Sequence, residues 1–215
     1  MSKKQHMSLK SIAIAVALSS MFPIAVHART SPVNQDSAKA KVDEVTHLLR
    51  QYKFTEAEAE LHKLGPPAIP HMLDAVGANL LGRPPVVSVF LQFIVSSESP
   101  EAESAVASLL SDKSAFLRGQ TISYLRSFGA CKVQRASLPY LIGLLRDTEI
   151  WLSGKTTRLI NPDPAEIEEI PFEFTVGDEA IEALQNITGM KLAEKGNKDE
   201  QVKAWLQWWQ IRPRQ

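Results

Sequence analysis

The sequence is short of cysteine, and this excludes two classes of small protein. Cys131 is the only cysteine among 215 residues. A disulfide framework therefore cannot form within the chain, and a zinc knuckle or ribbon lacks its thiolate ligands. Because Phe128 and Val133 flank Cys131 at an expected helix end, we predict that its side chain packs as a small apolar group rather than reacting.

An excess of charge of one sign is also missing. The chain carries 24 Lys and Arg residues against 24 Asp and Glu residues, so its formal net charge is zero. Nucleic-acid-binding domains usually show a basic excess, and we therefore predict no nucleic-acid partner. With 44% hydrophobic residues, the composition is too apolar for a disordered chain and is typical of a globular domain.

The one long apolar run lies at the N-terminus. Three lysines and no acid occupy the first ten residues, an apolar stretch covers 12–26, and Ala28 follows. This pattern predicts a signal peptide over 1–28 with cleavage after Ala28, hence a periplasmic or secreted protein. An uncleaved anchor is the alternative, although the run is shorter than the roughly 20 residues that span a bilayer.

After cleavage we expect no membrane span and a flexible leader at 29–37, followed by a domain over 38–212. From there apolar residues recur at helical spacing. The apolar face of the first expected helix comprises Val42, Val45, Leu48, Leu49 and Tyr52. Thr55 and Glu58 have the spacing of a capping box that opens a second helix, and Pro66 with Pro67 suits the first turn of a third.

A leucine motif recurs through the domain and predicts an internal repeat. Its first residues are Leu61, Leu91, Leu125 and Leu184, separated by steps of 30, 34 and 59 residues. The last step equals about two repeats, or one repeat with an insertion. Two helices in each 30 to 34 residues are typical of an α-solenoid, in which every helix pair stacks on the next to bury its apolar face. A bundle without true repeats is the alternative.

The residues of this motif resemble the HEAT-repeat family of armadillo-like helical proteins. The segments that carry the resemblance are 64–73, 109–125 and 138–147, and 178–189 is similar to a last repeat. Trp205, Trp208 and Trp209 resemble a tryptophan-rich closing helix, expected at 199–210. The resemblance implies an all-α fold: a short HEAT-like α-solenoid of about four helix pairs. It also implies that Asp112 and Arg118 join a polar ladder between repeats.

The segment 148–176 departs from the repeat pattern, and we expect an irregular insertion there. Asp163, followed by proline, suits the start of a short helical turn, and the alternation of Phe172 and Phe174 indicates a brief extended stretch. Long loops in compact domains are usually functional or mobile. We expect Trp151 and the two phenylalanines to cover one end of the core.

No motif for a cofactor or metal stands out. Gly154 to Thr156 resembles the end of a phosphate-binding loop, but Glu149 occupies the position of its first glycine. His47, His62 and His71 form no pair with metal-ligand spacing. The acids of 163–173 lack the spacing of a calcium-binding loop. We therefore predict neither a cofactor nor a metal.

Exposed residues of the second helix of each pair are the best candidates for a binding surface, because these helices line the concave side of a solenoid. Aligning the helices places His71, Ser108 and Tyr140 in equivalent positions, with Asp74 one turn beyond His71. Trp208 lies off the apolar face of the closing helix and is a candidate partner anchor. We predict a non-catalytic module that binds a protein or peptide.

Two other functions stay open. An enzyme or small-ligand binder would have its pocket beneath 148–176 and would use Trp151, Asp163 and Glu166 or Glu169. A deep pocket there with carboxylates of perturbed pKa would favour this alternative. The chain would otherwise be a purely structural domain of a larger envelope complex.

Overall fold

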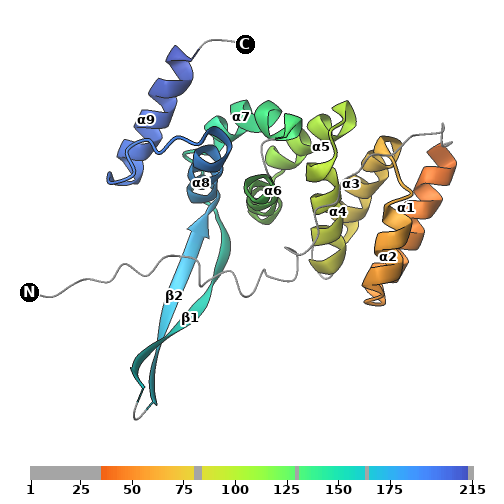
Figure 1. Cartoon of the computed structure of the whole chain (residues 1–215), viewed down its shortest axis with the longest axis horizontal. Coiled ribbons are helices and arrows are strands. Elements are labelled where there is room, and N and C mark those ends of the chain that lie inside the picture. Colours follow the sequence, from red (N-terminus) through yellow and green to blue (C-terminus); the bar gives the residue numbers. More distant parts are fainter. Residues whose placement is uncertain (1–34, 80–83, 129–130, 163–164, 213–215) are drawn as a thin grey trace, which may run out of the picture. The chain divides into compact units, whose positions relative to one another are not determined.

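The computed structural model describes residues 35–79, 84–128, 131–162 and 165–212. Within them the chain is mostly helical, as predicted, with nine α-helices and one two-stranded sheet (Figure 1). The elements are α1 (Gln35–Arg50), α2 (Phe54–Leu61), a 3₁₀ turn (Pro66–Ala68), α3 (Ile69–Asn79), α4 (Pro84–Ser96), α5 (Pro100–Leu110), α6 (Ala115–Ser127), α7 (Lys132–Leu144), β1 (Ile150–Pro162), β2 (Ala165–Thr175), α8 (Val176–Thr188) and α9 (Lys198–Ile211). These residues form a helical unit and a separate strand unit over 154–172.

Within the helical unit, helices contact those that follow closely in the chain. One series of contacts joins α1 to α3, α3 to α5, α5 to α7 and α7 to α9. A second series joins α4 to α6 and α6 to α8, and the two series meet where α3 packs on α4, α5 on α6 and α7 on α8. The core is thus built from contacts between helices near in sequence.

The repeated leucines lie in this core. Leu91, Leu125 and Leu184 are fully buried, and Leu61 is 3% exposed. Each such side chain contributes about 1.5–3 kcal/mol relative to an exposed position. The recurrence seen in the sequence therefore reflects burial of one apolar position per helix pair.

Side-chain caps define the starts of several helices. Oγ of Ser99 accepts a hydrogen bond from N–H of Ala102 (3.1 Å) at α5, and Thr175 with Asp178 forms a capping box at α8. The capping box predicted at Thr55 is wrong. Helix α2 begins at Phe54, and Lys53 at its N-cap makes no side-chain cap hydrogen bond.

The predicted leader at 29–37 extends too far, because α1 begins at Gln35. Polar residues at the first turn of a helix look like a loop in the sequence.

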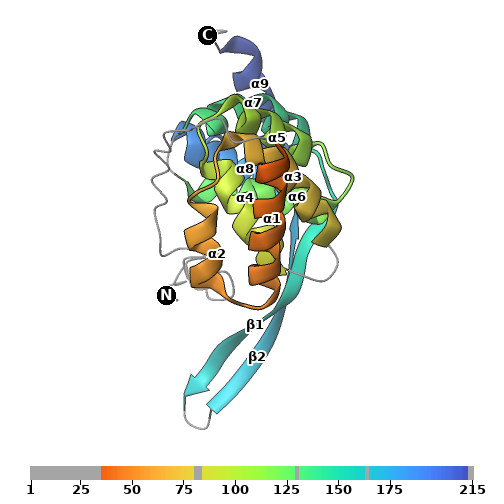
Figure 2. The ribbon, with the colours of Figure 1, turned by 90° about the vertical axis from the view of Figure 1, so that its right-hand side faces the viewer.

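The insertion is not irregular: it is a regular β-hairpin. Strands β1 and β2 are antiparallel neighbours joined by residues 163–164 (Figure 2). Asp163 lies outside the described residues, but β2 runs from Ala165, so no helical turn follows it. The β-branched and aromatic residues of both strands favour extended backbone over helix.

Two side-chain contacts join the strands of the hairpin. Nζ of Lys155 lies 2.7 Å from Oε2 of Glu169. The ring of Phe172 lies over Gly154, where a Cβ atom would come within 2.9 Å of it. A glycine at position 154 therefore makes room for the cross-strand aromatic ring.

The two ends of the insertion meet at the helical unit. N–H of Val176 donates to the carbonyl of Glu149 (3.0 Å), and N–H of Gly177 donates to that of Asp147 (2.9 Å). A Cβ atom at position 177 would lie 2.8 Å from the Asp147 carbonyl oxygen, so the approach requires glycine. The chain thus returns to the end of α7 after the hairpin, and α8 packs on α7. The 59-residue step from Leu125 to Leu184 therefore includes the hairpin.

Tyr52, predicted on the apolar face of the first helix, lies beyond its end and is 67% exposed. N–H of Lys53 donates to the carbonyl of Leu48 (3.0 Å) and N–H of Tyr52 to that of Leu49 (3.1 Å). This is the Schellman pattern, whose left-handed position usually carries glycine. Tyr52 adopts it with φ of 60°.

The conformation of Tyr52 yields a stability prediction. A left-handed backbone costs a non-glycine residue on the order of 1 kcal/mol, and an exposed ring offsets little of this cost. We expect Tyr52→Gly to raise the free energy of unfolding by about 0.5–1 kcal/mol in urea denaturation. Tyr52→Ala keeps a Cβ atom and should give no gain. Equal stabilisation by both substitutions would show that backbone strain is not the cause.

Candidate partner-binding surface

The residues predicted to form the binding row lie on three helices that contact one another in sequence. His71 on α3 is half-buried, Ser108 on α5 is exposed, and Tyr140 on α7 is 41% exposed. Helix α3 contacts α5, and α5 contacts α7. Asp74 is exposed one turn after His71.

His71 and Asp74 also line a cavity of about 430 Å³ between α1 and α3. The α1 wall carries charged and polar side chains that sequence reasoning did not select. They are Lys39, Asp43, Thr46, His47 and Arg50. The volume lies within the range of roughly 300–1,000 Å³ that is usual for small-ligand sites.

Arg50 and Asn79 close one side of this cavity. Nε and Nη2 of Arg50 donate to Oδ1 of Asn79 at 3.1 and 2.8 Å. The Asn79 amide nitrogen donates to the carbonyl of Ala75 (2.6 Å), and Asn79 is only 4% exposed. The last residues of α1 and α3 are therefore joined by a fixed polar contact.

A second cavity of about 370 Å³ lies between the first halves of α3 and α5. Its walls are mostly apolar, with Pro70 and Leu73 on one side and Pro100 and Ala105 on the other. Ser104, one turn before Ser108, also lines it. Both cavities thus open between helices of the series α1, α3 and α5.

Arg118 joins the turn that follows α5 to the segment that follows α7. Its Nη1 donates to the carbonyl of Asp112 (2.7 Å), and its Nε donates to Oδ2 of Asp147 (3.0 Å). Nη2 also pairs with Glu149. Burial opposes the charge, but hydrogen bonds to Glu149 and Asp147 raise the pKa of Arg118 overall.

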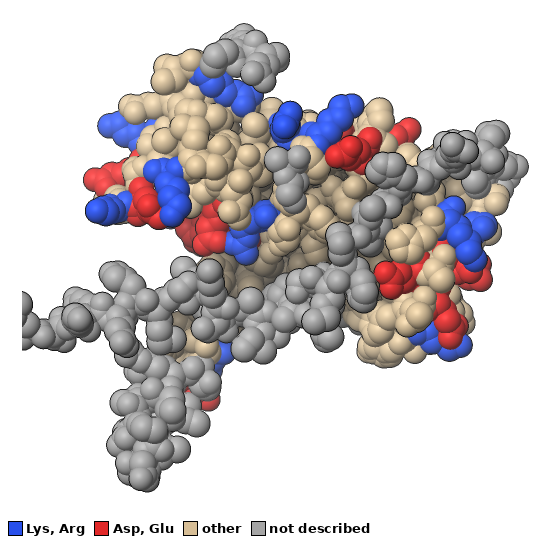
Figure 3. Space-filling view, in the orientation of Figure 1, with Lys and Arg blue, Asp and Glu red and all other residues tan. Residues whose placement is uncertain are grey.

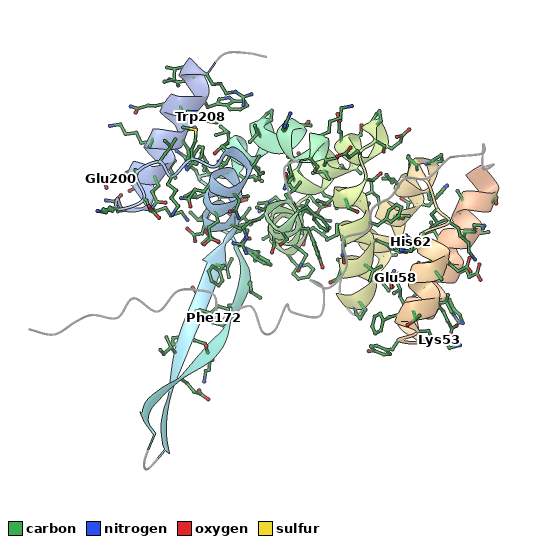
Figure 4. The ribbon with its side chains drawn as sticks, in the orientation of Figure 1. Lys53, Glu58, His62, Phe172, Glu200 and Trp208 are labelled. Carbon is green, nitrogen blue, oxygen red and sulfur yellow. The ribbon has the colours of Figure 1, made fainter. Side chains whose placement is uncertain are left out.

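Trp208 lies on α9 (Figure 4) and is half-buried. Its ring meets that of Trp205 edge-on, with centroids 5.3 Å apart. The guanidinium of Arg212 lies 3.4 Å from the ring centroid of Trp209 and 5.7 Å from that of Trp208. The Trp208 ring therefore already has Trp205 and Arg212 as neighbours.

The residues of the enzyme alternative are not brought together as a described site. Trp151 packs against Gly119 of α6, where it contributes to the core. Glu169 is exposed and paired with Lys155. Asp163 and the side chain of Glu166 lie outside the described residues.

One carboxyl group with a strongly perturbed pKa lies in the core instead. Burial raises the pKa of Glu179 on α8 from 4.5 to about 7, although the charge of Arg126 opposes the shift and Glu182 and Asp178 add to it. Oε1 of Glu179 lies 3.2 Å from Nη1 of Arg126. Glu179 lines neither of these two cavities.

Glu179 should make stability depend on pH. A pKa raised in the folded state favours folding below pH 4.5, and this contribution is lost as the pH rises through about 7. We expect the free energy of unfolding, measured in urea, to fall by about 2 kcal/mol between pH 5 and pH 8 from this group. Glu179→Gln should remove that part of the loss. An unchanged pH profile in the variant would contradict the assignment.

Charges of both signs are interspersed on the face of the molecule shown in Figure 3. Among the described residues, no group of three or more His, Cys, Asp or Glu side chains is placed to hold a metal ion. Over the same residues, no helix has the length and apolarity needed to cross a membrane.

Comparison of the chain with protein-family models, with curated proteins and with solved structures found no match. Any function therefore has to be argued from the residues and contacts of this chain.

Arg50 and Asn79 are among the cavity residues that the sequence analysis did not select. The polar side of α1 carries a charge or histidine on every turn, at Lys39, Asp43, His47 and Arg50. Such a pattern is typical of any solvated helix face, so it gave no specific signal. Only the packing of α1 beside α3 shows that these residues share a cavity with His71.

Proposed function

We propose that the chain is a short HEAT-like α-solenoid that acts outside the cytoplasm as a non-catalytic module binding a protein or peptide. The observation that carries this proposal is the serial contact of α1, α3, α5, α7 and α9. Serial stacking of helix pairs is how a solenoid buries its core while leaving an extended row of helices for a partner.

The exposed side chains of this row suit a protein or peptide. The row offers a histidine, a serine and a tyrosine rather than a basic track, and the largest of them, Tyr140, is 41% exposed. Tyrosine is enriched among residues that dominate binding energy. The two cavities between successive helices of the series add recesses for side chains of a partner.

The location outside the cytoplasm rests on the sequence of the first 28 residues, which lie outside the described part of the chain. The basic start, short apolar run and small residue at the exit are the pattern of a secretory signal. A cell fractionation that recovered the protein in the cytoplasm, with residues 1–28 retained, would contradict this part of the proposal.

The proposal is tested by replacing the three side chains of the binding row with alanine. We expect His71→Ala, Ser108→Ala and Tyr140→Ala together to reduce cross-linking to the partners in cell-envelope extract by at least about tenfold, since loss of one central contact often costs 1–2 kcal/mol. Mass spectrometry of cross-linked species measures this loss. A control triple at exposed Glu56, Lys113 and Lys203 should capture the same species as the wild type. Unchanged capture by the row variant would overturn the assignment.

A further inference from the structure

The guanidinium of Arg50 is held in place by a neutral group. Both hydrogen bonds from Nε and Nη2 go to the single oxygen Oδ1 of Asn79. Asn79 is buried, and its own amide nitrogen is fixed by the carbonyl of Ala75. The orientation of the Asn79 side chain is therefore fixed by hydrogen bonds at both its oxygen and its nitrogen. The contact orients the Arg50 fork without neutralising its charge, and Nη1 is left for another acceptor.

Two arginines that are more buried than the exposed Arg50 differ from it in this respect. Arg118 is paired with Asp147 and Glu149, and Arg126 is paired with Glu179 and Glu182. Arg50 forms no such ion pair with any described residue. An oriented arginine without a carboxylate partner, on the wall of a cavity, is suited to an anionic ligand.

The rest of the cavity limits the charge of that ligand. Lys39, His47 and His71 line it together with Arg50, but so do Asp43 and Asp74. Both α1 and α3 also end at the Arg50–Asn79 contact, and helix C-termini disfavour negative charge. These features favour one carboxylate on an otherwise neutral ligand over a multiply charged phosphate. Backbone N–H groups of a peptide would also suit the two aspartates as donors.

We propose that the cavity between α1 and α3 binds a carboxylate of a peptide segment, held by the Arg50 fork. The inference rests on the proposed function, because it names the chemistry of the partner at one end of the row that contains His71. Capture of a peptide carboxylate by fixed donors is a known mode of peptide recognition. The cavity of about 430 Å³ is large enough for a few residues of such a segment.

The test is a titration of the full, isotopically labelled chain with defined ligands, followed by NMR shifts of backbone amides. The probes are N-acetyl-Ala-Ala-Ala with a free carboxylate, the same peptide as its C-terminal amide, N-acetyl-Ala-Glu-Ala-amide, and inorganic phosphate. We expect at least one carboxylate peptide to shift signals of α1 and α3, and the uncharged amide to bind at least about tenfold more weakly, as loss of a charge-assisted hydrogen bond implies. Tighter binding of the peptide with a free C-terminus would identify the ligand group as a chain end. Tighter binding of the glutamate peptide would identify it as an acidic side chain.

Variants assign the effect to Arg50. Arg50→Gln should lower the affinity for the carboxylate peptide by at least about tenfold. Arg50→Lys keeps the charge but lacks the planar guanidinium, so its affinity should lie between those of the wild type and Arg50→Gln. Arg146→Gln is the matched control, because this exposed arginine lines neither cavity, and it should leave the affinity unchanged. Unfolding in urea checks that each variant is folded at the titration temperature.

Three results would overturn the inference: equal binding of the acid and the amide, tighter binding of phosphate than of either carboxylate peptide, or no shift in α1 and α3 with any probe. These failures are distinct from failure of the proposed function. If the row variant loses its partners but no carboxylate peptide binds, the cavity assignment is wrong and the binding row stands.

Discussion

Arg118→Met should lower the free energy of unfolding by about 2–4 kcal/mol, because removing one partner of a buried ion pair leaves the other uncompensated. The Arg118 side chain is 9% exposed and that of Asp147 is 15% exposed. Methionine would also leave the carbonyl of Asp112 without its donor. Urea denaturation monitored by circular dichroism measures the loss.

Two further variants show whether the loss of stability comes from the broken ion pair or from the changed shape of the side chain. Arg118→Met combined with Asp147→Asn removes the unpaired charge and should recover part of the loss. Arg146→Met alters an exposed arginine and should change stability by less than about 0.5 kcal/mol. A loss below 1 kcal/mol for Arg118→Met would mean that Asp147 and Glu149 are stabilised without it.

Gly119→Ala should cost about 2–3 kcal/mol, since an added atom forces a packed neighbour to move. A Cβ atom at position 119 would lie 2.1 Å from Cγ of Trp151 and 2.6 Å from its Cβ. Those atoms are next to the Trp151 backbone, so a side-chain rotation alone cannot relieve the overlap. The tryptophan packs on the core and would have to leave it.

A double-mutant cycle identifies Trp151 as the neighbour in question. Trp151→Gly, which also removes the Trp151 Cβ atom, should itself destabilise the protein. Adding Gly119→Ala to it should cost little more, giving a coupling energy of about 2 kcal/mol. Gly77→Ala is the matched control, because nothing lies within 4 Å of the added atom on α3. It should stabilise by about 0.5–1 kcal/mol, as usual for glycine to alanine in a helix. Additive losses at positions 119 and 151 would contradict the packing.

The helical class was predictable because burial repeats at helical spacing. Leu91, Leu125 and Leu184 each belong to a helix whose apolar residues recur every three or four positions, and all three are fully buried. Glycine and proline then mark where helices end or begin, as at Pro66 and Pro100. These signals are local, so one sequence suffices to detect them.

The hairpin was missed because its strands lack a single apolar face. Charged residues such as Lys155 and Glu169 interrupt the alternation and pair with each other across the strands instead. The only clear alternation, at Phe172 and Phe174, covers the end of β2 alone. Strands in which charged and apolar residues are mixed leave little periodicity to detect.

Tyr52 and Arg50 show why contacts beyond the helix are hard to predict. Tyr52 continues the apolar spacing of α1, but the Schellman turn removes it from the helix face. Arg50 gains its proposed role only through Asn79, which is 29 positions away in the chain. Pattern reasoning found His71 and Asp74 on α3 but had no means of finding the α1 wall of the same cavity.

The most direct test of this account is a methyl-methyl NOE map of the full chain with labelled Ile, Leu and Val side chains. The proposed solenoid predicts contacts between α1 and α3, α3 and α5, and α5 and α7, with none between α1 and α7 or α8. NOEs that link α1 to α7 or α8 would show a closed bundle, and the binding row of successive helices would then not exist.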